Sequence, residues 1–283
     1  MSCTAPIDLK TVGAAACQLK CFYWFKYGES SCTVRNGGTY LSIKYDGTSD
    51  VVFSNIKYTA NELRIYKPSL HTFNGKQAEG ELVLVHASTH DNLYVCIPLT
   101  TAGVYTSASA MLETIVNDAP LPSDGAVTLS VPNFNASTLI PKSAFFTYTG
   151  TSPLGDCGSD NHLLVFPMLA AINVPKDAMK SLGNSIAFSL INAVPGTCYY
   201  NEKGTASNGF AGDGQIYIAC QPTGEADEIT HQSTQNTSDK TDYSGLYGVF
   251  IMLGAIVAGF VFYRVLAMAF ANKGNVLKAP AGV

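Results

Sequence analysis

Histidine and cysteine are the residues of this 283-residue chain whose side chains could form a metal site. His86 and His90 have an H-x3-H spacing, which places two zinc ligands on one side of a helix. However, His86 ends an expected strand and His90 lies in the following turn, so we expect no metal site there. The chain has eight cysteines and no C-x2-C pair, so a zinc ribbon has no support. The other histidines are His71, His162 and His231.

The elements that would position these side chains are mostly short strands. Apolar residues recur at helical spacing between 111 and 116, and a second short helix is expected at 177–182. We therefore expect residues 1–222 to form one mainly β domain. Runs of strand length or strand alternation occur at 39–45, 81–85, 93–99, 126–131, 162–166 and 215–219.

Several of these segments resemble the α-carbonic anhydrase family. The run LRIYKPSLHT (63–72) is similar to the family's strand with two zinc-binding histidines and the turn after it. The run ELVLVH (81–86) is similar to the strand with the third histidine. The resemblance covers residues 5–190 and implies a large twisted central β-sheet with short peripheral helices. Further similar segments, in the family's order, are APIDLKT (5–11), TVRNGGTYLSI (33–43), DNLYVCIPL (91–99) and LIPKSAFFTYTGT (139–151).

The resemblance also implies where a catalytic zinc ion would bind, and this sequence departs from the family there. The three histidine positions hold Arg64, Tyr66 and Val83. Arginine stays protonated, valine has no donor atom, and one tyrosine is a poor substitute for three histidines. The positions of a supporting glutamate and a gatekeeping threonine hold Leu70 and Pro153. We therefore expect no zinc cofactor and no hydration of carbon dioxide.

Other residues acquire expected roles from the same resemblance. His71 and His86 match structural histidines of the family, so we expect both to be buried and hydrogen-bonded. Cys3 and Cys157 fall where family members from oxidising compartments often have a disulfide, although both would stay thiols in the cytosol. Arg64 would lie at the floor of the former active-site cone. A carboxylate partner or a filled cavity is expected there, because an unpaired buried charge is costly.

The C-terminal part of the chain predicts a membrane anchor. Only 13% of all residues are charged, about half the share in a typical soluble domain. The 21 residues from Tyr243 to Tyr263 carry no charge, which is enough to cross a hydrocarbon core of about 30 Å. We expect a polar linker at 223–242, a transmembrane helix at 243–271 and a short polar tail at 272–283. The apolar residues expected to span the bilayer include Leu246, Phe250, Leu253, Ile256, Phe260 and Tyr263.

Two sequence features disagree about the topology of this anchor. Arg264, Lys273 and Lys278 follow the span, and the positive-inside rule would place them in the cytoplasm. The N-terminus lacks the basic stretch and apolar run of a signal peptide. A C-terminal span without a signal peptide is typical of a tail anchor with a cytosolic domain, and we favour that interpretation slightly.

A carbonic-anhydrase-like domain without zinc ligands, followed by a span, resembles virion membrane proteins of large DNA viruses, including the poxvirus cell-surface-binding type. The resemblance implies a non-enzymatic minor capsid protein in an internal or envelope membrane of the virion, and in host membranes during assembly. Its partners would be the lipid bilayer and other capsid or virion proteins.

Two other functions are weighed against this one. The first is attachment to host glycosaminoglycan, but residues 1–222 carry 13 Lys and Arg against 16 Asp and Glu, with no basic run. That balance disfavours sulfated glycans, and we expect no nucleic-acid partner. The second is a carbonic anhydrase with unusual ligands, which Arg64, Tyr66 and Val83 disfavour.

Overall fold

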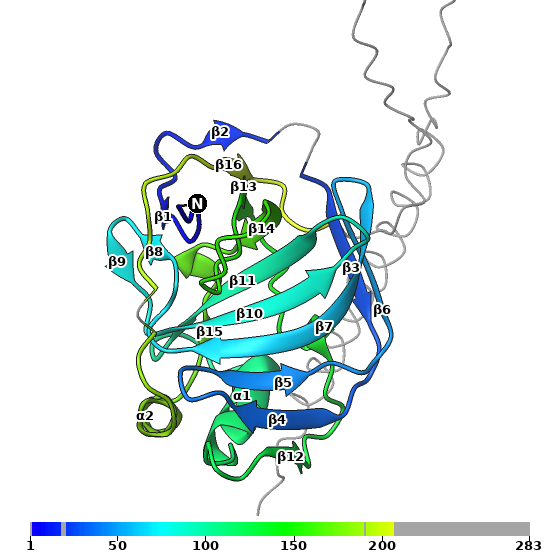
Figure 1. Cartoon of the computed structure of the whole chain (residues 1–283), viewed down its shortest axis with the longest axis vertical. Coiled ribbons are helices and arrows are strands. Elements are labelled where there is room, and N and C mark those ends of the chain that lie inside the picture. Colours follow the sequence, from blue (N-terminus) through cyan, green and yellow to red (C-terminus); the bar gives the residue numbers. More distant parts are fainter. Residues whose placement is uncertain (1, 18–20, 190, 207–283) are drawn as a thin grey trace, which may run out of the picture. The chain divides into compact units, whose positions relative to one another are not determined.

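The computed structural model describes residues 2–17, 21–189 and 191–206 (Figure 1). The predicted strand at 215–219, linker at 223–242, transmembrane helix at 243–271 and tail at 272–283 lie outside the described residues. The same holds for His231 and the residues expected to span the bilayer. No helix in the described part of the chain is both long enough and apolar enough to cross a membrane.

A large twisted β-sheet organises the described residues (Figure 1). Its centre consists of three antiparallel strands, β7 (Ile56–Tyr66), β10 (Gly80–Ala87) and β11 (Asn92–Thr100). The main path runs β12-β4-β5-β7-β10-β11-β14-β13-β16-β2, and β11 pairs with β14 in parallel. The prediction of a mainly β fold around a large twisted sheet is confirmed.

Shorter strands extend this sheet and flank it. β3, β6 and the first half of β7 form an antiparallel ribbon at one side. The remaining strands are β1 (Asp8–Leu9), β2 (Ala15–Ala16), β3 (Tyr23–Tyr27), β4 (Cys32–Asn36), β5 (Leu41–Lys44), β6 (Ser49–Phe53), β8 (Thr72–Phe73), β9 (Lys76–Gln77), β12 (Ala126–Leu129), β13 (Phe145–Gly150), β14 (Asn161–Val165), β15 (Ile172–Asn173) and β16 (Tyr199–Asn201).

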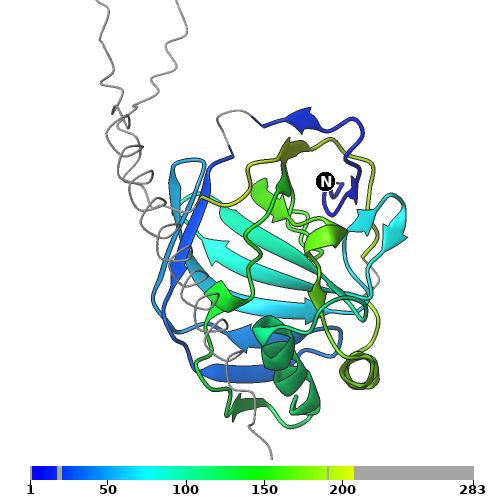
Figure 2. The ribbon, with the colours of Figure 1, turned by 180° about the vertical axis from the view of Figure 1, so that it is seen from behind.

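Two short α-helices cover one face of the sheet (Figure 2). α1 (Ser107–Asn117) begins with a capping box, in which Thr106 and Ser109 exchange side chain to backbone hydrogen bonds. α2 (Lys176–Ser185) packs beside α1. The helix predicted from the apolar spacing at 111–116 and the short helix expected at 177–182 are both confirmed. Two 3-10 helices, η1 (Ala136–Thr138) and η2 (Met168–Ala170), complete the described elements.

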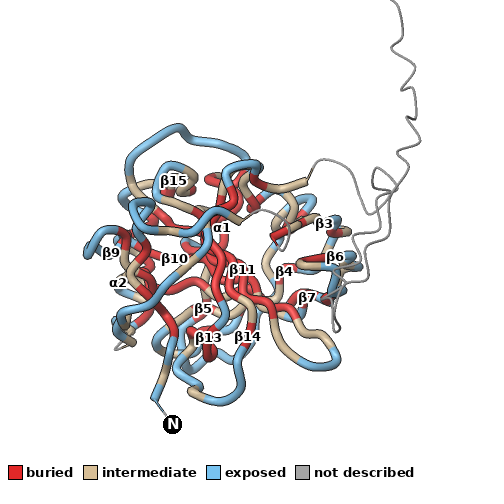
Figure 3. Tube along the Cα trace, turned by 90° about the horizontal axis from the view of Figure 1, so that it is seen from above, coloured by how far each residue is buried: buried red, intermediate tan, exposed pale blue. Residues whose placement is uncertain are grey.

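The central strands are buried on both faces, which explains their almost continuous apolar sequences (Figure 3). We call the face that packs against α1 the helix face; Leu63, Leu82 and Leu84 point to it. The opposite face is called the ligand-position face, because Tyr66 and Val83 point to it. Each face therefore has its own apolar cluster.

β12 differs from its sequence prediction. Its alternation favours a strand with one buried face, but none of its residues is buried and Val127 is 38% exposed. The reason is its place in the sheet: among the described strands β12 pairs only with β4 and forms one edge.

Candidate functional site

The three positions assigned to zinc ligands do come together in space. Arg64 on β7 and Val83 on β10 are direct cross-strand partners. Tyr66 lies two residues beyond Arg64, so its side chain points to the same face of the sheet. The strand register thus gives the geometry that a three-ligand site needs, and the side chains decide whether a metal ion fits.

Arg64 is held by neighbours on the same face. Its Nε donates a hydrogen bond to Oε2 of Glu62 at 2.9 Å, and its guanidinium carbon lies 4.6 Å from the centre of the Tyr40 ring. Glu62 also accepts a hydrogen bond from the Ser42 hydroxyl. The rings of Tyr40 and Tyr66 lie 5.5 Å apart. The expected carboxylate partner of Arg64 is therefore present, and its charge is balanced.

These side chains do not fit a catalytic zinc ion. Val83 is fully buried and offers no donor atom. Burial raises the pKa of Tyr66 to about 12, so its hydroxyl stays protonated at neutral pH. Arg64 would place a positive charge beside the metal ion. No deprotonated ligand remains at the three positions, and we derive no zinc chemistry from them.

His71 belongs to a buried hydrogen-bond network on the ligand-position face. Its Nδ1 donates to Oε1 of Glu81 at 2.6 Å, and a hydrogen bond of 2.7 Å joins its Nε2 to the Tyr148 hydroxyl. Oε2 of Glu81 accepts from the backbone N–H groups of Leu70 and His71, at 2.7 and 2.9 Å. His71 and Glu81 are fully buried. The network ties the turn at 69–71 to β10 and β13.

Cys96 on β11 adds a sulfur atom to this network. His71, Glu81 and Cys96 are the only group of three potential metal ligands among the described residues, with their donor atoms within 4.8 Å of one another. Burial and the charge of Glu81 raise the pKa of Cys96 well above its usual value. A metal ion would have to replace the hydrogen bond between His71 and Glu81 and deprotonate this thiol. Without a metal ion, the His71 ring nitrogens and the Glu81 carboxylate oxygens already have hydrogen-bond partners.

His86 forms a second network, on the helix face. Its Nδ1 donates to the Leu93 carbonyl at 3.1 Å, and the Tyr27 hydroxyl donates to its Nε2 at 2.6 Å. Burial lowers the pKa of His86 to about 4, so the ring is neutral. His90 is exposed in the turn after β10, and the two histidines do not converge on a site. The expectation that His71 and His86 are buried and hydrogen-bonded is confirmed.

No family model matches this sequence, and no curated protein matches it. Solved structures do. An α-carbonic anhydrase from Photobacterium profundum has a TM-score of 0.59 and 17% identity, covering 71% of this chain and 89% of its own. The enzyme from Thermovibrio ammonificans has a TM-score of 0.61 and 18% identity, covering 71% and 87%. Dioscorin, solved in complex with ascorbate, has a TM-score of 0.58 and 18% identity, covering 73% and 88%.

The described residues have the α-carbonic anhydrase fold. Identities this low show the fold and leave the activity open. Within the fold, β7 and β10 carry the assigned ligand positions, and Glu81 lies two residues before Val83 on the same face of β10. No role was predicted from the sequence for Glu81, Tyr148 or Cys96. The ELVLVH segment, which resembles the family, begins with Glu81, so a role for Glu81 could have been predicted from the resemblance.

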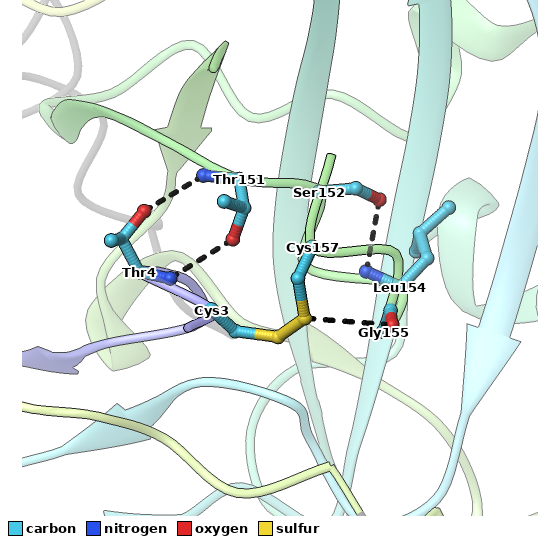
Figure 4. The surroundings of a disulfide bond; sticks show 7 residues. All are labelled: Cys3, Thr4, Thr151, Ser152, Leu154, Gly155 and Cys157. Atoms are coloured by element: carbon cyan, nitrogen blue, oxygen red, sulfur yellow. Dashed lines mark hydrogen bonds between the residues drawn. A yellow bond between two sulfur atoms is a disulfide. The ribbon is translucent and has the colours of Figure 1, made fainter. Parts of the chain in front are cut away.

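The N-terminal segment is fastened to this α-carbonic anhydrase fold by a disulfide between Cys3 and Cys157, the pair that the resemblance implies (Figure 4). Their Cα atoms are 4.8 Å apart, within the usual range for a disulfide. Beside the bond, Thr4 and Thr151 exchange two hydrogen bonds between backbone N–H and side-chain hydroxyl groups, at 3.0 and 2.9 Å. A second disulfide, Cys17–Cys21, was not foreseen from the sequence.

Proposed function

We propose that this chain is a non-enzymatic structural protein of a membrane-containing virion. A transmembrane helix at 243–271 anchors it, and the carbonic-anhydrase-like domain binds neighbouring capsid or virion proteins and tethers them to the viral membrane. The observation that carries the non-enzymatic part is the occupancy of the ligand positions by Arg64, Tyr66 and Val83. The virion part is supported by the resemblance of the whole arrangement to viral membrane proteins.

The state of Arg64 supports a domain that does not catalyse hydration. Catalysis by this fold needs a metal ion that lowers the pKa of a bound water molecule to about 7. Arg64 instead forms an ion pair with Glu62 and stacks over Tyr40. A paired guanidinium, a protonated phenol and an isopropyl group have no means of producing a hydroxide ion. The scaffold around them keeps its buried networks at His71 and His86.

The surface of the described domain supports binding to other proteins. Low charge and exposed apolar side chains favour packing against neighbours over suspension in solvent. The 21 uncharged residues from 243 to 263 support insertion into a bilayer. Exposed large apolar residues include Val12, Val104, Leu121, Leu169 and Phe188.

The non-enzymatic part is tested on the purified full chain. Metal analysis should find no stoichiometric zinc, and stopped-flow assays should find carbon dioxide hydration at the background rate. Stoichiometric zinc together with hydration above background would overturn the proposal. The triple variant Arg64→His, Tyr66→His and Val83→His should still fall short of full activity, because Leu70 and Pro153 leave the supporting positions unrestored.

The virion part is tested in particles. Cross-linking of intact virions should join the domain to other virion proteins, and the full chain should fractionate with the viral membrane. A chain without residues 243–283 should fold and no longer reach that membrane. A domain that projects from the particle without neighbours and binds heparin saturably would replace our proposal with the attachment function.

A further inference from the structure

A pocket of about 500 Å³ opens on the helix face, away from the assigned ligand positions. Thr149 on β13 and His162 on β14 are cross-strand partners and form part of its floor. His162 shares its face with Leu164, which belongs to the cluster that packs against α1. Phe53 and Asn55 of the β6–β7 hairpin, Tyr199 of β16 and the Cys17–Cys21 disulfide complete the principal walls.

The His162 ring is held between a carboxylate and an aromatic ring. Its Nε2 lies 3.4 Å from Oδ2 of Asp91, and its ring packs edge-on against Phe53 with centres 5.4 Å apart. Asp91 is itself fixed by hydrogen bonds from the hydroxyls of Tyr58, at 3.1 Å, and Ser88, at 2.7 Å. A carboxylate only accepts hydrogen bonds, so Nε2 carries the proton that faces it. Nδ1 has no hydrogen-bond partner among the described residues.

Other neutral polar groups of the pocket are also without partners in the described part of the chain. They are the Thr149 hydroxyl, the Asn55 amide and the Tyr199 hydroxyl. Tyr199 is 54% exposed, so its ring presents an apolar surface at the pocket mouth. The pocket therefore combines an aromatic platform with several donors and acceptors on different walls.

The charges around the pocket narrow the class of ligand. No Lys or Arg is among the lining residues that the structure describes, and the carboxylate of Asp91 lies 3.4 Å from the His162 ring. Among the described residues, sulfate, phosphate and carboxylate groups therefore find no Lys or Arg to balance their charge. A pyranose ring matches what is present, because its C–H face stacks on an aromatic ring while its hydroxyls donate and accept hydrogen bonds.

We propose that this pocket binds a neutral sugar residue. The proposal does not depend on the proposed function: it concerns other residues, on the opposite face of the sheet. It also differs from attachment to sulfated glycosaminoglycan, which would need basic side chains.

The test uses the full chain in a detergent without a sugar head group. Saturation-transfer NMR is recorded with the methyl glycosides of galactose, glucose, mannose and N-acetylglucosamine, and with a sulfated heparin disaccharide. At least one neutral glycoside should bind saturably with a millimolar dissociation constant, and the disaccharide should not bind at the pocket. The proposal is overturned if no neutral glycoside binds saturably.

Matched variants locate the binding. Tyr199→Ala should weaken it about tenfold, the equivalent of 1.4 kcal/mol. Tyr105→Ala is the control, because Tyr105 is 53% exposed and lies outside the pocket. Asn55→Gly removes an amide and suits the positive φ of 67° at that turn, so it should weaken binding without affecting folding. If Tyr105→Ala weakens binding as much as Tyr199→Ala, or if neither pocket variant weakens it, the assignment to this pocket is wrong.

Discussion

The two buried histidines on opposite faces of the sheet have different partners and different electrostatics. On the ligand-position face, His71 donates to the carboxylate of Glu81. On the helix face, the hydrogen-bond partners that His86 has among the described residues are neutral: the Tyr27 hydroxyl and the Leu93 carbonyl. Both side chains are fully buried. The partner, rather than burial, therefore decides whether a core histidine belongs to a charged network or a neutral one.

The largest effect should come from the charged network. Burial by itself raises the pKa of Glu81, but His71 and the backbone N–H groups of His71 and Leu70 lower it below its usual value. Glu81→Gln removes the charge and turns an amide group toward donors. We expect a loss of about 4 kcal/mol in the free energy of unfolding, because the buried donors lose the charged acceptor that satisfied them. Urea unfolding of the full chain, followed by the fluorescence of its single tryptophan, Trp24, measures this loss.

Glu113→Gln is the matched control for this substitution. The Glu113 carboxylate accepts one exposed hydrogen bond, from the Tyr105 hydroxyl. We expect a change within about 0.5 kcal/mol for the control. If Glu81→Gln costs no more than Glu113→Gln, the network on the ligand-position face does not hold the fold together, and the comparison fails.

The neutral network should give a smaller effect that depends on pH. The pKa of His86 is lowered by burial from 6.5 to about 4. Between these values the unfolded chain binds a proton that the folded chain refuses, so stability is complete above pH 6.5 and falls as pH decreases toward 4. The loss over this window should be about 3 kcal/mol. As pH decreases, this loss comes before the loss from Glu81. The pKa of Glu81 is lowered, so its contribution to stability is lost only below the usual pKa of 4.5.

Urea unfolding at several pH values separates the two contributions. His86→Gln has no titrating group and should flatten the dependence between pH 6.5 and 4.5. His90→Gln changes an exposed histidine and should leave the pH dependence of stability unchanged. A variant at position 86 that keeps the full slope would show that another group titrates in this window.

The smallest effect should come from the partly exposed cluster around Arg64. The side chains of Arg64 and Glu62 are 23% and 24% exposed. Such ion pairs contribute about 1 kcal/mol or less, so Arg64→Met should lower the free energy of unfolding by less than about 1 kcal/mol. Methionine keeps the packing over Tyr40 and removes the charge. Arg35→Met on β4 is a control without an ion pair among the described residues, and a loss above about 2 kcal/mol at Arg64 would contradict us.

Periodicity and the order of short motifs were enough to predict the fold class and part of the secondary structure. The apolar spacing at 111–116 predicted α1, and the run at 81–85 predicted β10, because helix and strand periods are local properties of the chain. The resemblance of short motifs in a fixed order predicted the fold, the residues at the ligand positions and the burial of His71 and His86. The first two inferences use only neighbouring residues, and the others take their long-range contacts from the resemblance to the family.

Which distant side chains meet depends on the tertiary structure. The tertiary structure brings Tyr148 into hydrogen-bond contact with His71, 77 residues away. It also packs His162 against Phe53 and places it in the same pocket as Tyr199. It also places β12 at an edge, where Leu129 is only partly buried against the core and Val127 stays exposed. The physical reason is the same in each case. Hydrogen bonds, pKa shifts and pockets depend on separations of a few ångströms between segments far apart in the chain, and sequence periodicity contains no such distances.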